Sequence, residues 1–94
     1  MKRQMKPVHP GAILREDILN EMNLTVTIAA TRLGISRKHL SGIVNEQVSM
    51  TAEMAVRLEQ AFGVEAGFWL DLQKKYDIWK VHQDGNIHVD RIRA

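Results

Sequence analysis

The chain has 94 residues, of which 45% are hydrophobic and 26% charged, and its formal net charge is +2. These values are typical of one globular domain. The absence of cysteine excludes disulfides and thiolate chemistry. No apolar run approaches the length of a membrane span, and no apolar signal core follows the basic N-terminal residues. We therefore expect a cytoplasmic protein without a membrane partner.

The N-terminal part is predicted to be a flexible basic arm at residues 1–8, followed by a helical domain at residues 9–81. Pro10 is suited to the first turn of a helix. We expect this first helix to run to about residue 22, because its apolar residues recur at helical spacing: Ile13, Leu14, Ile18 and Met22.

Residues 26–45 are predicted to form a helix, a tight glycine turn and a second helix. Gly34 can adopt the left-handed conformation that ends a helix, and Ser36 is a good N-cap for the next one. The residues expected to face the core are Ala29, Ala30 and Leu33 in the first helix and Leu40, Ile43 and Val44 in the second. This layout is that of a helix-turn-helix, whose second helix enters the DNA major groove.

The charge of the chain is unevenly distributed. Residues 22–45 contain Arg32, Arg37 and Lys38 but no acidic residue. By themselves, three basic side chains only indicate a solvated helix face. Because this acid-free block coincides with the helix-turn-helix pattern, we interpret it as the attraction that DNA phosphates require.

Two further helices are predicted. The fourth is capped by Thr51 and ends at Gly63, and its expected buried residues are Ala55, Leu58, Ala61 and Phe62. The fifth runs from about residue 66 to about residue 81 and carries Phe68, Trp69, Leu72, Tyr76 and Trp79 at helical spacing. Phe68, Trp69 and Leu72 fit the core, whereas Tyr76 and Trp79 lie further out and fit an interface.

Residues 82–94 are predicted to form a tail or a short strand. A turn signal at residues 83–86 is followed by β-branched residues in partial alternation. A lone strand needs an outside partner, either a second copy of the chain or another protein; the other interpretation is an unpaired tail. The residues that we assign to a dimer interface are Trp69, Tyr76, Trp79, Ile87 and Val89.

Catalysis and metal binding are not predicted. The four histidines are scattered, and no metalloprotease, nucleophile-elbow or phosphate-loop motif occurs. His82, Asp84, His88 and Asp90 are close in sequence, but loose matches of this kind often mislead. We therefore expect no enzymatic activity, no metal and no cofactor.

Four ordered motifs carry a family resemblance: His9-Pro10-Gly11-x-Ile13-Leu14, Leu33-Gly34-Ile35-Ser36-Arg37, Met54-Ala55-x-Arg57-Leu58 and Phe68-Trp69-Leu70-x-Leu72-Gln73. Together they resemble the HigA antitoxins, of the VapI type, within the phage-repressor-like helix-turn-helix superfamily. The resemblance covers roughly residues 8–78. It implies a compact, all-α, five-helix fold like that of the lambda repressor.

The resemblance also implies a function. Such proteins are antitoxins of type II toxin–antitoxin pairs, which neutralise a HigB-like mRNA endonuclease. As homodimers, they bind operator DNA and repress their own operon. A stand-alone transcriptional repressor without a toxin partner is the alternative.

Two departures from the family pattern concern the fold. Ala29 stands where leucine is more common, and Ile28 where a polar residue is usual, which suggests an apolar face rotated by one position. The fifth helix is preceded by residues 64–66 in place of the usual Ser or Thr followed by Pro.

The residues expected to read bases lie at the N-terminal end of the recognition helix. Arg37 can make a bidentate contact to guanine, and Lys38 can contact a base or a phosphate. Ser41 lies one turn further on. Gly42 either permits close approach to a thymine methyl group or relieves crowding at a helix crossing.

The phosphate contacts are assigned to Thr27, Ser36, His39 and Asn45. Helix N-termini bind anions, which favours Thr27. Asn45 resembles a phosphate-contacting position of related motifs and can also act as a C-cap. A two-fold homodimer on an inverted repeat would place its recognition helices about 34–36 Å apart.

Overall fold

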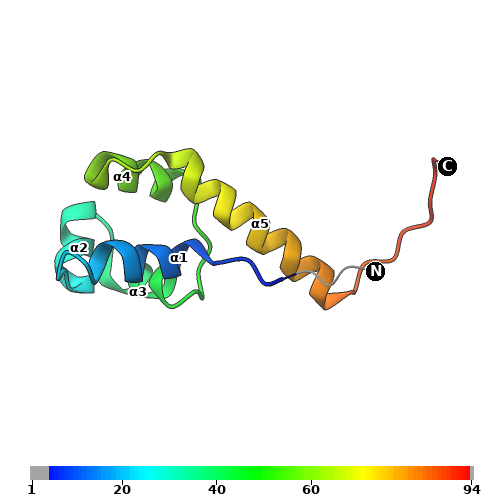
Figure 1. The fold of residues 1–94 in the computed structure, drawn as a ribbon, viewed down its shortest axis with the longest axis horizontal. Coiled ribbons are helices and arrows are strands. Elements are labelled where there is room, and N and C mark those ends of the chain that lie inside the picture. Colours follow the sequence, from blue (N-terminus) through cyan, green and yellow to red (C-terminus); the bar gives the residue numbers. More distant parts are fainter. Residues whose placement is uncertain (1–4, 94) are drawn as a thin grey trace.

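The structure is a computed structural model that describes residues 5–93. Its helical stretches are α1 (Pro10–Ile13), η1 (Leu14–Leu19), α2 (Val26–Leu33), α3 (Arg37–Val44), α4 (Ala52–Phe62) and α5 (Ala66–Asp84). The stretch η1 is π-helical and continues α1 without a break, so the two form one helix (Figure 1). The predicted all-α, five-helix fold is confirmed.

The first helix begins at His9, whose Nδ1 atom accepts a hydrogen bond from the Gly11 backbone N–H at 2.9 Å. It is followed by a turn at residues 20–23, whose last residue, Asn23, has a positive φ of 55°. Met22 therefore lies outside the regular helix and is 57% exposed. The first helix thus ends at Leu19, about three residues before the predicted end.

The caps of α2 and α3 follow the sequence. The Thr25 hydroxyl accepts a hydrogen bond from the Ile28 N–H, and the Ser36 hydroxyl accepts one from the His39 N–H. Between the two helices, Gly34 has a φ of 73°, which favours glycine. Ala29 is buried and Ile28 is 47% exposed, so the apolar face of α2 is not rotated.

The core lies where α1, η1, α2, α3, α4 and the start of α5 meet. Gly11 permits the close crossing of α1 and α3, because a Cβ atom there would lie 1.8 Å from the Ile43 carbonyl oxygen. The buried apolar side chains are Leu14, Leu19, Ala29, Ala30, Leu33, Leu40, Ile43, Val44, Met50, Met54, Ala55, Leu58 and Trp69.

The predicted core residues of α4 and α5 need three corrections. Ala61 is exposed, and Met54 lies in the core instead. Phe68, expected inside, is 44% exposed, whereas Trp69 is fully buried. Trp69 fills the core of its own chain, so its assignment to the dimer interface was wrong.

Helix α5 projects from the body of the molecule (Figure 1). The molecule measures 52 × 22 × 22 Å, and its radius of gyration of 15.8 Å exceeds the roughly 12 Å of a compact chain of this length. Only Trp69 and Gln73 of α5 are buried. Its N-terminal turns are thus anchored in the core, while the rest of the helix extends away from the body (Figure 1).

Residues 5–8 run along α5 toward the first helix (Figure 1). Lys6 places its Nζ atom 5.8 Å from the centre of the Trp79 ring, a distance at which a cation–π attraction acts. This part of the predicted arm therefore contacts α5. Residues 1–4, its remainder, lie outside the described residues.

The C-terminal tail follows α5, which ends at Asp84, three residues beyond the prediction. Residues 85–93 contain no strand, and the rest of the described range, residues 5–84, offers no strand with which they could pair. Of the two interpretations of this segment, the unpaired tail describes the monomer. Ile87 and Val89 are 69% and 74% exposed.

Buried polar groups connect α5 to the rest of the fold. The Gln73 Oε1 atom accepts a hydrogen bond from the Met50 N–H at 2.7 Å, and its Nε2 atom donates to Asp77 at 2.8 Å. The His9 ring meets Tyr76 edge-on at 4.9 Å between ring centres. Burial lowers the pKa of the His9 imidazole, an effect that Glu46 and Asp77 oppose.

Candidate nucleic-acid interface

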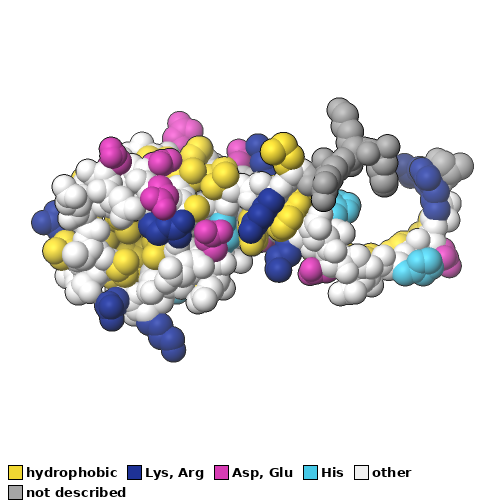
Figure 2. All heavy atoms as spheres, turned by 60° about the horizontal axis from the view of Figure 1, so that its bottom comes forward, with side chains coloured by type: hydrophobic (Ala, Val, Ile, Leu, Met, Phe, Trp, Pro, Cys, Tyr) yellow, Lys and Arg dark blue, Asp and Glu magenta, His cyan; other side chains and the backbone are white. Residues whose placement is uncertain are grey.

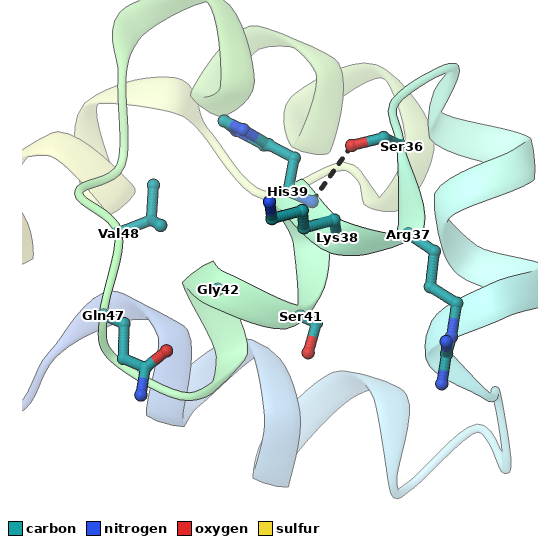
Figure 3. A pocket seen from close by; sticks show the side chains of 8 residues that line it. All are labelled: Ser36, Arg37, Lys38, His39, Ser41, Gly42, Gln47 and Val48. Atoms are coloured by element: carbon teal, nitrogen blue, oxygen red, sulfur yellow. Dashed lines mark hydrogen bonds between the residues drawn. The ribbon is translucent and has the colours of Figure 1, made fainter.

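A hollow of about 640 Å³ runs along the exposed side of α3 (Figure 3). It brings together six of the predicted DNA contacts and two residues that were not predicted to contact DNA. The lining residues are Ser36, Arg37, Lys38, His39, Ser41, Gly42, Gln47 and Val48. No acidic residue belongs to this lining.

Arg37 and Lys38 form the first turn of α3, and both are exposed. Arg37 extends along the side of α3 away from Val48, whereas Lys38 extends from the same turn nearer to the loop (Figure 3). Lys and Arg side chains project from the lower edge of the helical body, and Asp and Glu gather on its upper part (Figure 2). The body therefore offers an anion a positively charged edge.

The other predicted polar contacts are spread over three helix ends, namely the start of α2 and both ends of α3. The Ser36 hydroxyl caps α3, and Asn45 follows its last turn, with its amide 3.3 Å from the Ser41 hydroxyl. Thr27 is exposed in the first turn of α2. Thr27 and Asn45 thus do not line the hollow: Thr27 lies at the start of α2, and Asn45 lies at the end of α3.

Gly42 is explained by its neighbour in the loop after α3. A Cβ atom at this position would lie 2.5 Å from the Val48 Cγ2 atom. The glycine therefore relieves crowding, as one interpretation proposed, but the neighbour is a loop residue and not a second helix. Val48 occupies the space beside α3 that a side chain at position 42 would fill.

Gln47 and Val48 were not predicted to belong to this surface; Val48 packs against the core and also lines the hollow. Val48 is half-buried and Gln47 exposed. The signal in the sequence was Gly42, since an isolated glycine inside a helix often marks a close approach.

Two arginines from other helices support the motif. Arg57 of α4 donates a hydrogen bond to the Leu33 carbonyl at the end of α2. Arg15 of η1 donates one to the Val44 carbonyl at the end of α3 and lies 3.8 Å from Glu46. These contacts hold α2 and α3 in place relative to the body.

A second surface lies on the outer half of α5. Tyr76 and Trp79 are half-buried, and their ring centres are 5.9 Å apart. Exposed apolar side chains continue this surface, with Ile78 at 53% and Val81 at 49%. A groove of about 290 Å³ beside them is lined by Met5, Pro7, Lys75, Ile78 and Trp79.

The described residues show neither a metal cluster nor a membrane span. Within residues 5–93, no three His, Asp or Glu side chains come together as metal ligands. His88 and Asp90 approach each other at 3.6 Å, fully exposed on the tail. No helix in the described range is both long and apolar enough to cross a bilayer.

Comparison with known proteins places this geometry in a family. The family model described as "Helix-turn-helix" matches residues 14–69. The chain is 41% identical to virulence-associated protein I of Dichelobacter nodosus over 83 residues, which are 88% of this chain and 77% of the relative. It is 33% identical to antitoxin HigA-1 of Vibrio cholerae, covering 83% of this chain and 73% of that protein.

A solved structure agrees along the full length. The antitoxin GraA in complex with its operator matches with a TM-score of 0.84 and 35% identity, over 100% of this chain and 99% of GraA. Together with the matched motif and the fold, these likenesses show that the chain belongs to the helix-turn-helix family, in the group of the VapI and HigA proteins.

Proposed function

We propose that this protein is a transcriptional repressor that binds operator DNA through α3 and serves as the antitoxin of a type II toxin–antitoxin pair. The observation that carries the DNA-binding part is the exposed, acid-free surface at the N-terminal end of α3. The comparison that supports DNA binding is the similarity to the antitoxin GraA, whose structure was solved in complex with the GraA operator.

On DNA, α3 would lie in the major groove with Arg37 and Lys38 at the base edges. Arginine bonds two acceptors of guanine at once, which discriminates by about 1–3 kcal/mol. Ser41, one turn later, reaches a base or a phosphate. Thr27, Ser36, His39 and Asn45 hold the phosphates on either side and fix the position of the helix.

The operator-bound form would be a two-fold homodimer. The outer half of α5 and the tail supply the interface, because Tyr76, Trp79, Ile87 and Val89 place apolar groups outside the core. A symmetric dimer presents two copies of α3 to the two halves of an inverted repeat.

The antitoxin part of the proposal is supported by the likeness to HigA-1. The chain would sequester a HigB-like mRNA endonuclease by direct binding and would have no enzymatic activity of its own. In this role, one protein couples toxin neutralisation to repression of the operon that encodes both.

Two experiments test the proposal. Fluorescence anisotropy with duplex DNA from upstream of the reading frame should show tight, saturable binding that unrelated DNA of equal length does not compete away. Co-expression with the protein encoded next to it should relieve growth arrest caused by that protein. DNA binding with persistent arrest would leave a stand-alone repressor, and absence of selective binding would refute the repressor.

A further inference from the structure

We infer that Gln47 and Val48 form a second base-reading element, which acts beside α3 and selects an A·T base pair. This inference rests on the proposed DNA binding and deepens it by adding a specificity-determining loop. The loop, residues 45–48, leaves the end of α3 and turns back onto the same exposed side of the helix (Figure 3).

The backbone holds the loop against α3. Asn45 caps the helix, and Glu46 has a positive φ of 63° that reverses the chain. The N–H groups of Gln47 and Val48 then both donate to the Gly42 carbonyl oxygen, at 2.9 and 3.1 Å. One acceptor thus fixes two successive loop residues to the last turn of the recognition helix.

Side chains from elsewhere in the fold hold both ends of this loop. At its start, Arg15 bonds the Val44 carbonyl and lies 3.8 Å from Glu46. Beyond its end, the Met50 N–H donates to the buried Gln73 side chain. The loop is therefore preorganised before DNA arrives, which lowers the entropy cost of binding.

The inference depends on one feature: a loop side chain fills the place that a side chain of α3 would otherwise occupy. Position 42, one residue after Ser41, carries no side chain, and the space beside it is occupied by Val48. Gln47 is exposed, and none of the hydrogen bonds within residues 5–93 uses its side-chain amide. The surface of α3 thus presents an aliphatic group and a free amide that come from the loop.

These two groups match the major-groove edge of an A·T pair. A glutamine amide can accept from adenine N6 and donate to adenine N7, and an aliphatic side chain contacts the thymine C5-methyl group. Arg37 and Lys38 lie in the first turn of α3, whereas the loop lies beside its last turn. The A·T pair contacted by the loop would therefore be a different base pair from the one that Arg37 reads, and would lie to one side of it.

The test is a base-preference measurement with chemically altered DNA. Wild-type protein first selects its site from a random duplex library. Each thymine of that site is then replaced by deoxyuridine, which lacks the C5-methyl group, and each adenine by 7-deazaadenine, which lacks N7. We expect wild-type affinity to fall severalfold at one thymine and one adenine per half-site.

The variants decide the assignment. Gln47→Ala should lose about tenfold preference for the A·T pair and become insensitive to 7-deazaadenine, and Val48→Ala should become insensitive to deoxyuridine. Gly42→Ala, which pushes Val48 away, should reproduce both losses. Ser49→Ala, an exposed neighbour outside the lining, is the matched control. Because Gln47 is exposed, Gln47→Ala should fold normally. It therefore still tests base reading by the loop if Val48→Ala impairs folding.

The outcomes separate this inference from the proposed function. Wild-type protein that selects no site refutes DNA recognition as a whole. Wild-type selection that Gln47→Ala leaves unchanged, or that it weakens equally for every sequence, overturns the base-reading loop while DNA binding stands.

Discussion

The Arg57 Nη1 atom donates a hydrogen bond to the Leu33 carbonyl oxygen at 2.8 Å, so that α4 closes the C-terminal end of α2. Arg57 also pairs with Glu53, one turn earlier in α4. A cation at a helix C-terminus is favoured by the helix dipole and by the free carbonyl groups there. This one side chain therefore joins the first helix of the motif to the body that carries it.

Replacement of Arg57 by Ala should lower the free energy of unfolding by about 1–2 kcal/mol, because a partly buried carbonyl loses a charged donor. Urea denaturation followed by circular dichroism measures this change. Arg32→Ala, which removes an exposed arginine of α2, should change it by less than about 0.5 kcal/mol. Equal effects of the two variants would contradict the capping role of Arg57.

The crossing of α1 and α3 should not tolerate a methyl group. In Gly11→Ala, the new Cβ would lie 1.8 Å from a backbone oxygen, which cannot move without separating the helices. We expect a loss of about 3 kcal/mol or more. Gly67→Ala meets nothing within 4 Å and should stabilise α5 by up to about 1 kcal/mol. Similar thermal midpoints for the two variants would refute the close crossing.

Stability should depend on the protonation of His9. Burial lowers the pKa of its imidazole below the unfolded value of 6.5, so the unfolded chain takes up a proton first as the pH falls. The contribution of neutral His9 to stability is therefore present above the unfolded pKa of 6.5 and is lost as the pH falls from there through the lower pKa of the folded state. Protonation also removes the Nδ1 acceptor that caps the first helix.

His9→Asn isolates this effect, because asparagine keeps an acceptor at the N-cap but does not titrate. The free energy of unfolding, measured between pH 5 and 8, should depend less steeply on pH in this variant than in wild type. His82→Asn, on the exposed end of α5, serves as the control and should keep the wild-type slope. Identical slopes for all three proteins would exclude His9 as the titrating group.

The apolar surface of α5 should govern self-association. Ile78 is 53% exposed in the monomer, and Ile78→Asp would place a charged side chain in the proposed interface. Because burying an unpaired charge is costly, this variant should raise the dimer dissociation constant by at least tenfold. Sedimentation equilibrium measures the constant. Gln83→Asp adds the same charge to an exposed polar position of the same helix. A monomeric wild type, or equal constants for both variants, would contradict an interface at Ile78.

The local signals in the sequence were sufficient for most of the fold. Ser36 and Thr51 cap the helices that they were predicted to cap, because N-capping depends on a side chain and on amides three residues away. The buried faces of α2 and α3 were also predicted correctly, from the spacing of their apolar residues. Helical periodicity is a local property that the chain carries without its partners.

The errors arose where tertiary contacts decide the outcome. Phe68 and Trp69 are adjacent aromatic residues at the start of α5, and only the direction of α5 determines which of them enters the core. The role of Gly42 depends on Val48, which returns to it only through the positive φ of Glu46. Neither hydrophobic periodicity nor residue type predicts that the chain reverses its direction at Glu46.

The central claim is that α3 reads DNA through its N-terminal turn, and Arg37→Ala tests it most directly. Competition anisotropy with the selected duplex and with the same duplex altered at its guanines measures selectivity. Arg37→Ala should lose roughly tenfold or more of the preference for the intact site while keeping the wild-type unfolding midpoint and dimer constant. A variant that retains wild-type affinity and selectivity would contradict the claim.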